Sequence, residues 1–478
     1  MKLSHGHGYL ALGLQLVFFI LFCIFVRYHP DANARHHPLV NGTKLEDKLD
    51  HYKSDDPWAH SRTYPMFQDV HVMIFIGFGF LMMFLKRYGL SAVGMNFLIA
   101  ALCLQWAILV NGFFHLKEGL IMVDLNALLG ADFTAATILI SFGVMIGKTT
   151  PTQLILLSLM EVPLFAINEV IGRNYFGAID MGDSMFVHAF GAYFGLAASL
   201  MIYRRDASTE KEGSSYQSDL FAMIGTVFLW LYWPSFNAGA APGDDQHRGI
   251  INTYISLIAC CVTTFALSSI VDKHKKFDMV HVQNSTLAGG VAIGTAADLM
   301  VHPWGAALVG MLASLVSVCG YAYLTPCIAK RLRIHDTCGV HNLHGMPGVL
   351  AGIIGAVAAA LASEATYGLS LYEIFPARAP IEGSPELQRL REMLPGLEGG
   401  SGLTGSGQAL YQLLALAVTL AIAIGGGLVT GFVLRLGPLS VLTTEELYED
   451  EKWWIMESEE DEGHKGSVSI PMADNGAR

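Results

Sequence analysis

Long apolar runs, each about 20 residues in length, recur along almost the whole chain. A helix needs about 20 mostly apolar residues to cross the hydrocarbon core of a bilayer, so each run predicts one transmembrane helix. The pattern therefore predicts an all-α polytopic membrane protein with about twelve spans. The predicted spans are residues 8–27, 67–85, 91–114, 124–147, 151–172, 184–203, 218–237, 250–271, 280–300, 303–325, 340–362 and 409–436.

Composition supports this interpretation. The chain has 478 residues, of which 53% are hydrophobic and 15% are charged, whereas an average soluble domain has about 25% charged residues. Much of the net charge of -12 comes from an acidic tail within residues 437–478, which we interpret as a solvated cytoplasmic end. All seven cysteines lie in apolar runs or in loops predicted to face the cytoplasm, so no disulfide framework is expected.

Lysine and arginine are distributed unevenly between the loops. The short intervening loops contain only Lys117, Arg173 and Arg248. Positively charged loops face the cytoplasm, so both termini should be cytoplasmic and residues 28–66 extracellular. Asn41-Gly-Thr43 lies in this outer segment and predicts N-glycosylation at Asn41. The positively charged alternate loops contain Lys86, Arg87, Lys148, Arg204, Arg205, Lys211, Lys273, Lys275, Lys276, Lys330, Arg331 and Arg333.

The first apolar run has two interpretations, because Ala32-Asn-Ala34 behind it resembles a signal-peptidase site. We favour a retained extra first helix over residues 8–27. Its apolar core from Leu10 to Val26 is longer than the 7–15 residues usual for a signal peptide. Cleavage would leave the orientation of the other spans unchanged.

One spacing occurs twice in the chain. Asp180 precedes His188 by eight residues, and Asp336 precedes His344 by the same interval. The predicted topology places Asp180 at the outer end of its helix and Asp336 at the inner end of its own, which is the pattern of an inverted repeat. The two repeats would be residues 67–203 and 218–362, related by a pseudo-two-fold axis around a central pore, with 8–27 and 409–436 as additions.

Eight residues of helix rise about 12 Å, so each histidine should lie near the bilayer midplane. Ionisable residues at that depth usually face a bundle interior or a pathway, and this symmetric pair is our candidate pore. Two neutral imidazoles can share one proton and offer hydrogen bonds to a small polar solute without a fixed charge. For Asp180 and Asp336 we prefer capping of a helix N-terminus to a direct part in transport, which stays open.

Several longer segments carry a family resemblance. They are Ser184-Met-Phe-Val-His-Ala-Phe-Gly-Ala-Tyr-Phe-Gly195, Asp336-Thr-Cys-Gly-Val-His-Asn-Leu-His-Gly-Met-Pro-Gly348, Tyr64-Pro-Met-Phe-Gln-Asp-Val-His71, Ala131-Asp-Phe133, Tyr232-Trp-Pro-Ser-Phe-Asn237 and Asp278-Met-Val-His-Val-Gln-Asn284. With these segments the chain resembles the Rh glycoproteins of the ammonium transporter superfamily, in particular their non-erythroid type B and type C members.

The resemblance implies a homotrimer in which each subunit has its own pore, with His188 and His344 as the twin pore histidines. Phe133 and Phe236 match a stacked phenylalanine gate at the outer mouth. Glu169 matches an acidic residue of the outer vestibule, where it would concentrate ammonium. Without the resemblance, an equally good interpretation is a residue at a helix end in contact with water.

The expected function is an ammonium/ammonia channel of the plasma membrane. Ammonium would lose its proton at the outer vestibule, and neutral ammonia would cross in either direction down its gradient. The alternatives are a carbon dioxide channel, an electrogenic ammonium transporter, a membrane metalloenzyme and a non-transporting scaffold. Retention of both histidines argues against the scaffold.

The chain departs from the family pattern in two places. Phe186-Val-His188 replaces an expected Thr-Ile-His, and residues 363–408 are rich in Gly, Pro and Glu. His341, three residues before His344, raises the question of a metal site, but a closed site needs about four ligands. We therefore expect no enzyme activity, metal, cofactor or nucleic-acid partner. Tyr448-Glu-Asp450 in the tail is a candidate motif for a cytoskeletal adaptor.

Overall fold

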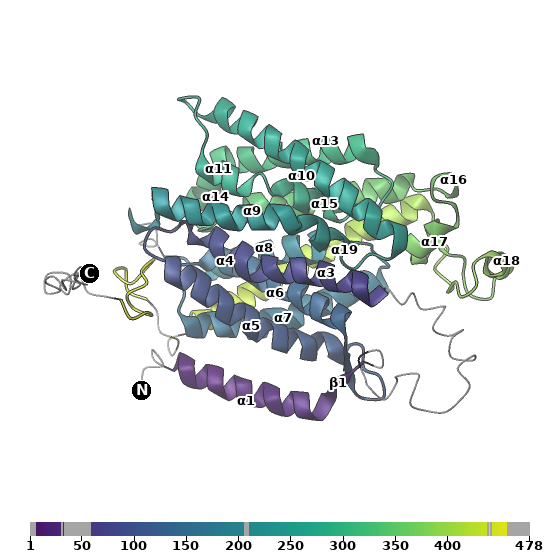
Figure 1. The fold of residues 1–478 in the computed structure, drawn as a ribbon, viewed down its shortest axis with the longest axis horizontal. Coiled ribbons are helices and arrows are strands. Elements are labelled where there is room, and N and C mark those ends of the chain that lie inside the picture. Colours follow the sequence, from purple (N-terminus) through teal and green to yellow (C-terminus); the bar gives the residue numbers. More distant parts are fainter. Residues whose placement is uncertain are drawn as a thin grey trace, which may run out of the picture.

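The computed structural model describes residues 6–29, 32, 59–204, 210–436, 439 and 442–456. The predicted glycosylation site at Asn41 lies outside these residues. The main helices lie roughly parallel in one bundle (Figure 1). They are α1 (His7–Phe25), α3 (Ala59–Val72), α4 (Phe78–Leu81), α5 (Gly89–Phe113), α6 (Leu125–Met145), α7 (Pro151–Val170), α8 (Phe190–Met201), α9 (Tyr216–Ala238), α10 (Gly243–Val271), α13 (His302–Cys319), α14 (Thr325–Leu332), α15 (Met346–Leu361) and α19 (Gly405–Leu434).

Several helices continue through or begin with a wider π-helical turn. These turns are η4 (Met73–Gly77), η6 (Ile171–Tyr175), η7 (Ser184–Ala189), η9 (Gly320–Leu324) and η10 (His341–Gly345). Joined across such turns, eleven helices in the described part of the chain are long and apolar enough to cross a membrane. The all-α polytopic architecture is therefore confirmed.

The predicted span at 280–300 is wrong as a continuous helix. The chain forms α11 (Met279–Asn284) and α12 (Ala288–Gly294), separated by three residues in turns. Both pieces are packed inside protein, where freed backbone groups find partners: the carbonyl of Ser285 accepts a hydrogen bond from Cys260 Sγ. Glycines allow this close packing, since a Cβ at Gly290 would lie 2.7 Å from the Trp233 ring.

The tail residues 442–456 define one end of the bundle, which we call the tail end. The backbone N–H of Tyr448 donates to the carbonyl of Gly147, and Glu449 pairs with both Arg87 and Lys211 at 2.9 and 2.8 Å. Figure 1 shows the beginning of α1 and the yellow segment before the C-terminal grey trace at this end. Three of the alternate loops predicted to share one side of the membrane therefore meet the tail.

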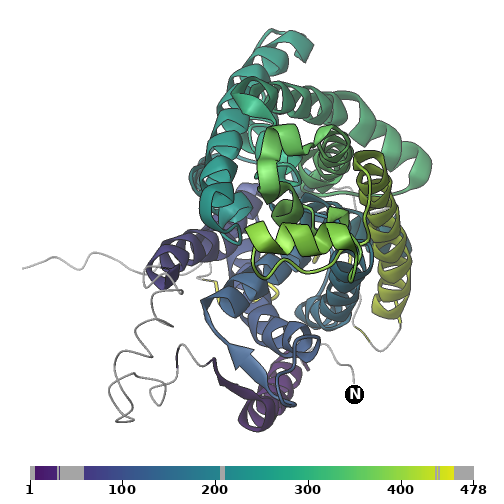
Figure 2. The same ribbon diagram turned by 90° about the vertical axis from the view of Figure 1, so that its right-hand side faces the viewer.

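The opposite end of the bundle, which we call the far end, contains the small sheet. Strand β1 (Val26–Tyr28) pairs in parallel with β2 (Ile121–Val123). The Gly- and Pro-rich segment folds here into α16 (Glu364–Tyr367), α17 (Leu371–Ile374) and α18 (Pro385–Met393). Figure 2 looks onto this end and shows the light green segment lying across the bundle.

Helix α1 packs against the outside of the bundle. Gln15 and Gln105 exchange amide hydrogen bonds at 2.7 and 3.1 Å, and the Phe18 ring stacks on Trp106 at 5.6 Å. Most other side chains of α1 are exposed and apolar, as expected of a helix that faces lipid on most of its surface.

The crossing between α9 and the span formed by α3, η4 and α4 tolerates no side chain at Gly225. A Cβ there would lie 2.0 Å from the backbone nitrogen of Leu81 and 2.6 Å from the carbonyl oxygen of Gly77. We expect Gly225→Val to destabilise the fold by about 2 kcal/mol or more, because neither backbone can move away freely. Thermal unfolding in detergent measures this. Gly425→Val is the matched control, since no atom lies within 4 Å of its Cβ position; equal midpoints for the two variants would contradict the prediction.

Candidate functional site

The two histidines of the repeated spacing lie side by side in the centre of the bundle. His188 is carried by η7 and His344 by η10. Their Nδ1 atoms are 3.0 Å apart, and the side chains are 1% and 3% exposed. A hydrogen bond at this distance needs one Nδ1–H donor and one bare Nδ1 acceptor, and two neutral imidazoles meet this need by sharing one proton.

The same local geometry places each histidine. Asp180 accepts hydrogen bonds from the backbone N–H groups four and five residues later, at 3.0 and 2.8 Å. Asp336 does the same four and five residues later, at 2.9 and 2.8 Å. The residue three positions after each aspartate, Asp183 and Gly339, has a left-handed backbone with φ of 53° and 68°. Both carboxylates thus cap a helix N-terminus, as preferred from the sequence.

Asp180 also links the two repeats. Its Oδ1 accepts a hydrogen bond from the Thr295 hydroxyl at 2.6 Å, so the cap of one repeat is bonded to the broken span of the other. Burial raises the pKa of the Asp180 carboxyl, and the hydrogen bonds from Thr295 and the backbone oppose this rise. The aspartate is therefore a structural anchor of the helix that holds His188.

The histidines form the middle of a four-ring stack. Phe78 lies against His344 with 6.1 Å between ring centroids, His344 against His188 at 5.0 Å, and His188 against Trp233 at 5.5 Å. The angles between successive ring planes are 18°, 14° and 26°. Each histidine thus packs on an aromatic ring from the first helix of the opposite repeat, which fixes the imidazole planes. Phe78 and Trp233 were not predicted in this role from the sequence.

Two polar atoms beside this stack are buried without a hydrogen-bond partner among the described residues. They are Nε2 of His188 and Nε1 of Trp233. Both residues also contact Phe236, with centroid distances of 5.4 Å for His188 and 6.2 Å for Trp233. Buried polar groups usually have partners, so this pair of atoms is suited to hold a small polar solute.

Phe133 and Phe236 close the path toward the far end. Their ring centroids are 4.8 Å apart, and the rings are 7% and 1% exposed. The resemblance implied stacked rings, but their planes meet at 61°, so one edge faces the other ring. Aromatic quadrupoles favour this arrangement over a face-to-face sandwich.

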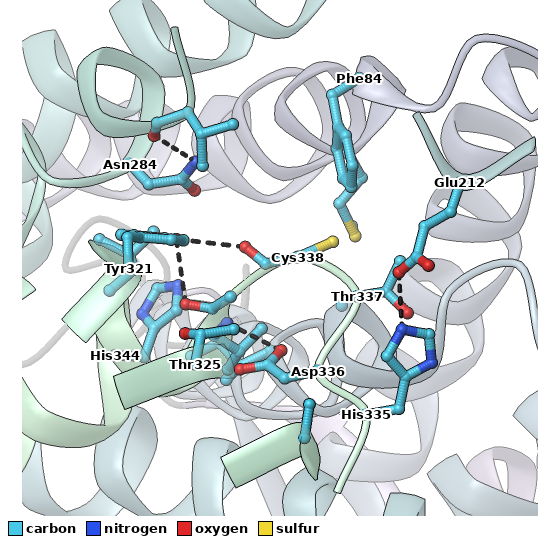
Figure 3. A pocket seen from close by; sticks show the side chains of 18 of the residues that line it. Phe84, Glu212, Asn284, Tyr321, Thr325, His335, Asp336, Thr337, Cys338 and His344 are labelled. Carbon is cyan, nitrogen blue, oxygen red and sulfur yellow. Dashed lines mark hydrogen bonds and ion pairs between the residues drawn. The ribbon is translucent and has the colours of Figure 1, made fainter. Parts of the chain in front are cut away.

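Toward the tail end the histidines open onto a cavity of about 590 Å³. His344 lies at its inner limit, and its wall includes Tyr321, Asp336, Cys338 and Glu212 (Figure 3). His335 joins two wall segments by a 2.7 Å contact with Glu212. The pore is thus closed by apolar rings on one side and open on the other.

Lys148 lies close to this wall. Its ammonium group donates hydrogen bonds to the carbonyls of Val144 and His335 at 2.9 and 2.7 Å. Burial lowers the pKa of Lys148 to about 8, while the carboxylates of Glu212 and Asp336 oppose the shift. From the sequence, Lys148 was interpreted only as one of the positive charges that place its loop on the cytoplasmic side.

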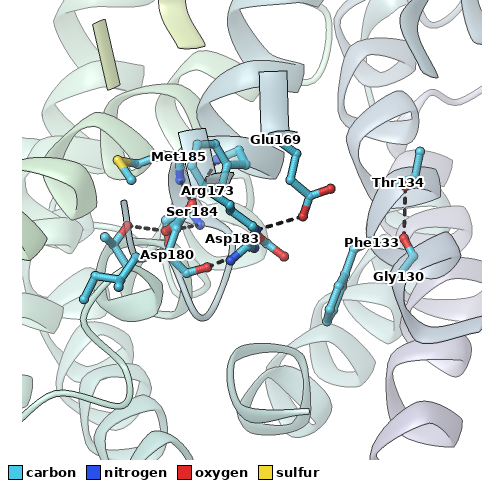
Figure 4. A network of polar contacts seen from close by, with 12 residues as sticks. Gly130, Phe133, Thr134, Glu169, Arg173, Asp180, Asp183, Ser184 and Met185 are labelled. Carbon is cyan, nitrogen blue, oxygen red and sulfur yellow. Dashed lines mark hydrogen bonds and ion pairs between the residues drawn. The ribbon is translucent and has the colours of Figure 1, made fainter. Parts of the chain in front are cut away.

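Glu169 belongs to an ion-pair network at the far end. Its carboxylate accepts from Nε of Arg173 at 2.9 Å, and Arg173 also pairs with Asp183 (Figure 4). Burial raises the pKa of the Asp183 carboxyl well above its usual range, and the Arg173 charge opposes this rise. Arg173 therefore neutralises part of the charge of Glu169, which the resemblance matches to an acidic residue of the outer vestibule. The spacing of four residues between them was the available signal.

His341, which raised the question of a metal, contacts Tyr193 edge to face at 5.7 Å. Among the residues that the structure describes, no cluster of three or more His, Cys, Asp or Glu side chains has an arrangement that could hold a metal ion.

Known proteins resemble this chain along most of its length. The family model described as Ammonium Transporter Family matches residues 58–453. Ammonium transporter Rh type B-B of Xenopus laevis is 49% identical over 458 residues, which cover 95% of this chain and 93% of that protein. Ammonium transporter Rh type C of Homo sapiens is 46% identical over 447 residues, covering 93% and 88%.

Solved structures share the fold. A structure of Rh50 from Nitrosomonas europaea superposes with a TM-score of 0.67 at 31% identity, covering 84% of this chain and 94% of that one. Mep2 of Saccharomyces cerevisiae superposes with a TM-score of 0.63 at 18% identity, covering 84% and 93%. The family match spans well over half of the chain, and the chain therefore belongs to the Ammonium Transporter Family.

Proposed function

We propose that this chain is an ammonium/ammonia channel that conducts neutral ammonia past His188 and His344. The observation that carries the proposal is the neutral histidine pair, with a buried and unpartnered Nε2 on His188, between closed aromatic rings and an open cavity. The relatives named as ammonium transporters and the Rh50 channel structure support the choice of solute.

Hydrogen-bond chemistry favours ammonia over ammonium at this point. The indole N–H of Trp233 can only donate, and ammonia has a lone pair to accept it, whereas ammonium has none. One Nε2 of the histidine pair is a donor and the other an acceptor, because the shared proton occupies one Nδ1. A cation would also pay several kcal/mol or more to enter a site at membrane depth. The site therefore acts as a filter for the neutral form.

We further propose that ammonium gathers at the far end before it loses its proton. The carboxylates of Glu169 and Asp183 share a single guanidinium there, that of Arg173, which also donates to the backbone carbonyl of Asp180. Two acidic groups that share one positive charge still attract a cation. Direction would follow the gradients of ammonia and of protons, since the channel has no energy source of its own.

The location and assembly follow the same reasoning. We propose that the tail end is cytoplasmic, because the lysine- and arginine-rich loops gather there, and that the far end is extracellular at the plasma membrane. Membership of the family supports a homotrimer with one pore in each subunit.

Replacing both histidines should abolish most of the ammonia flux. We expect His188→Leu with His344→Leu to reduce it at least about tenfold, because the buried solute would lose hydrogen bonds that nothing replaces. The measurement is stopped-flow internal pH in proteoliposomes under an ammonium gradient, with membrane current recorded in parallel. His115→Leu, at an exposed histidine, is the control. Undiminished flux in the double variant would rule out the pore, and current proportional to flux would indicate electrogenic transport.

Trp233→Phe tests the donor directly, because it keeps a stacked ring and removes the N–H. We expect ammonia flux to fall about threefold to tenfold, the usual cost of one hydrogen bond. Trp230→Phe is the matched control, since its Nε1 is also buried and unpartnered but its ring contacts Tyr254 on α10. Equal flux in the two variants would show that the Trp233 N–H does not bind ammonia. Carbon dioxide uptake, measured in the same liposomes, shows whether the channel conducts carbon dioxide as well as ammonia.

A further inference from the structure

Helix α3 makes a polar contact next to each of the two closing phenylalanines. His71 Nδ1 lies 3.0 and 3.2 Å from the two carboxylate oxygens of Asp132, which directly precedes Phe133. Asp69 accepts a hydrogen bond at 2.6 Å from the hydroxyl of Ser235, which directly precedes Phe236. We call these two contacts the α3 tethers.

Helix geometry explains how the single helix α3 contacts both α6 and α9. Residues 69 and 71 of α3 project about 200° apart around its axis, since each residue turns about 100°. One therefore reaches α6 and the other reaches α9. On α6 and α9 the tethered residue and the phenylalanine after it also project about 100° apart. Each tether thus binds one side of a helix, and the next side chain on that helix, about 100° further around its axis, is a phenylalanine that closes the proposed path.

The tether to α6 joins a buried carboxylate, that of Asp132, to a partly exposed ring, that of His71. Asp132 is 0% exposed, and a carboxylate at membrane depth is costly unless it is paired. His71 lies between Phe67 and Phe75, with centroid distances of 5.3 and 4.9 Å, so its ring has little freedom to turn away from Asp132. A rotation of α6 about its axis would break this contact.

The tail-end half of the same span is fixed independently. Beyond His71 the span passes through η4 and then crosses α9, where Gly225 brings the two backbones together. The π-helical turn separates this crossing from the tethers, and such turns occur frequently at functional sites. The far-end half of the span therefore holds α6 and α9 by the tethers, not by the glycine crossing.

We infer that His71 and Asp69 are positioning residues that hold Phe133 and Phe236 in edge contact and so limit the size of the neutral amine that passes. This inference rests on the proposed function, in which these two rings close the ammonia path. At a centroid distance of 4.8 Å the rings leave no gap, so a solute passes only when a ring moves. Loss of a tether allows the ring to move further. The flux of larger amines then increases more than the flux of ammonia.

The test compares ammonia with dimethylamine in proteoliposomes, measuring the internal alkalinisation rate that each produces. Ser235→Ala and His71→Ala break one tether each, and we expect the ratio of dimethylamine to ammonia flux to rise about fivefold in each variant, a factor typical of one lost hydrogen bond. Asp69→Asn and Asp132→Asn keep an oxygen acceptor, so they should retain a ratio close to that of the unchanged protein.

Ser158→Ala is the matched control, because it removes a buried hydroxyl whose partners, the carbonyl of Leu154 at 2.9 Å and the Cys103 side chain on α5, belong to neither α6 nor α9. A partly unfolded sample lowers both fluxes and leaves their ratio unchanged, so the ratio distinguishes positioning from stability. If His71→Ala fails to fold, Ser235→Ala tests the inference through the other tether.

An unchanged ratio in the tether variants, while the unchanged protein still shows ammonia flux that depends on its histidines, would overturn the inference and leave the proposed function standing. Flux no faster than that of empty liposomes in the unchanged protein would overturn the proposed function itself. A ratio that rises in Ser235→Ala and His71→Ala and stays close to that of the unchanged protein in the two asparagine variants would support the inference.

Discussion

The hydrogen bond between the two Nδ1 atoms of His188 and His344 is the interaction on which the proposed pore depends. Two imidazoles buried at this depth would be costly if either were charged, and the shared proton lets both stay neutral while each has a partner. The remaining architecture serves this contact. The two aspartate caps set the helix ends, the π-helical turns bring the rings inward, and Phe78 and Trp233 hold the ring planes.

The inverted repeat makes the histidine contact symmetric, whereas the surroundings of the pair are not. The left-handed position is Asp183 in one repeat and Gly339 in the other. Asp183 adds its carboxylate to the Arg173–Glu169 pair at the far end, whereas Gly339 has no side chain that could do the same. Phe236 lies beside His188, whereas an open cavity lies beside His344. The two repeats therefore share a backbone arrangement, while the two approaches to the histidine pair differ.

Much of the architecture was predictable from the sequence, because run length and loop charge report directly on membrane crossing. The histidine pair followed from a repeated spacing. The break between α11 and α12 did not, since an apolar run that is buried in protein looks the same as one that faces lipid. The edge-to-face angle of Phe133 and Phe236 and the reach of His71 to Asp132 depend on how helices are rotated against one another. The contact between Glu169 and Arg173 was predictable from spacing and was missed.

The unequal entrances have a pharmacological consequence. A cavity of about 590 Å³ is within the range that accommodates a drug-sized molecule, and it leads to His344 without an intervening gate. The opposite approach ends at two touching rings. An inhibitor that competes at the histidines would therefore act from the tail side, and with the cytoplasmic orientation that we propose for that side it would first have to enter the cell.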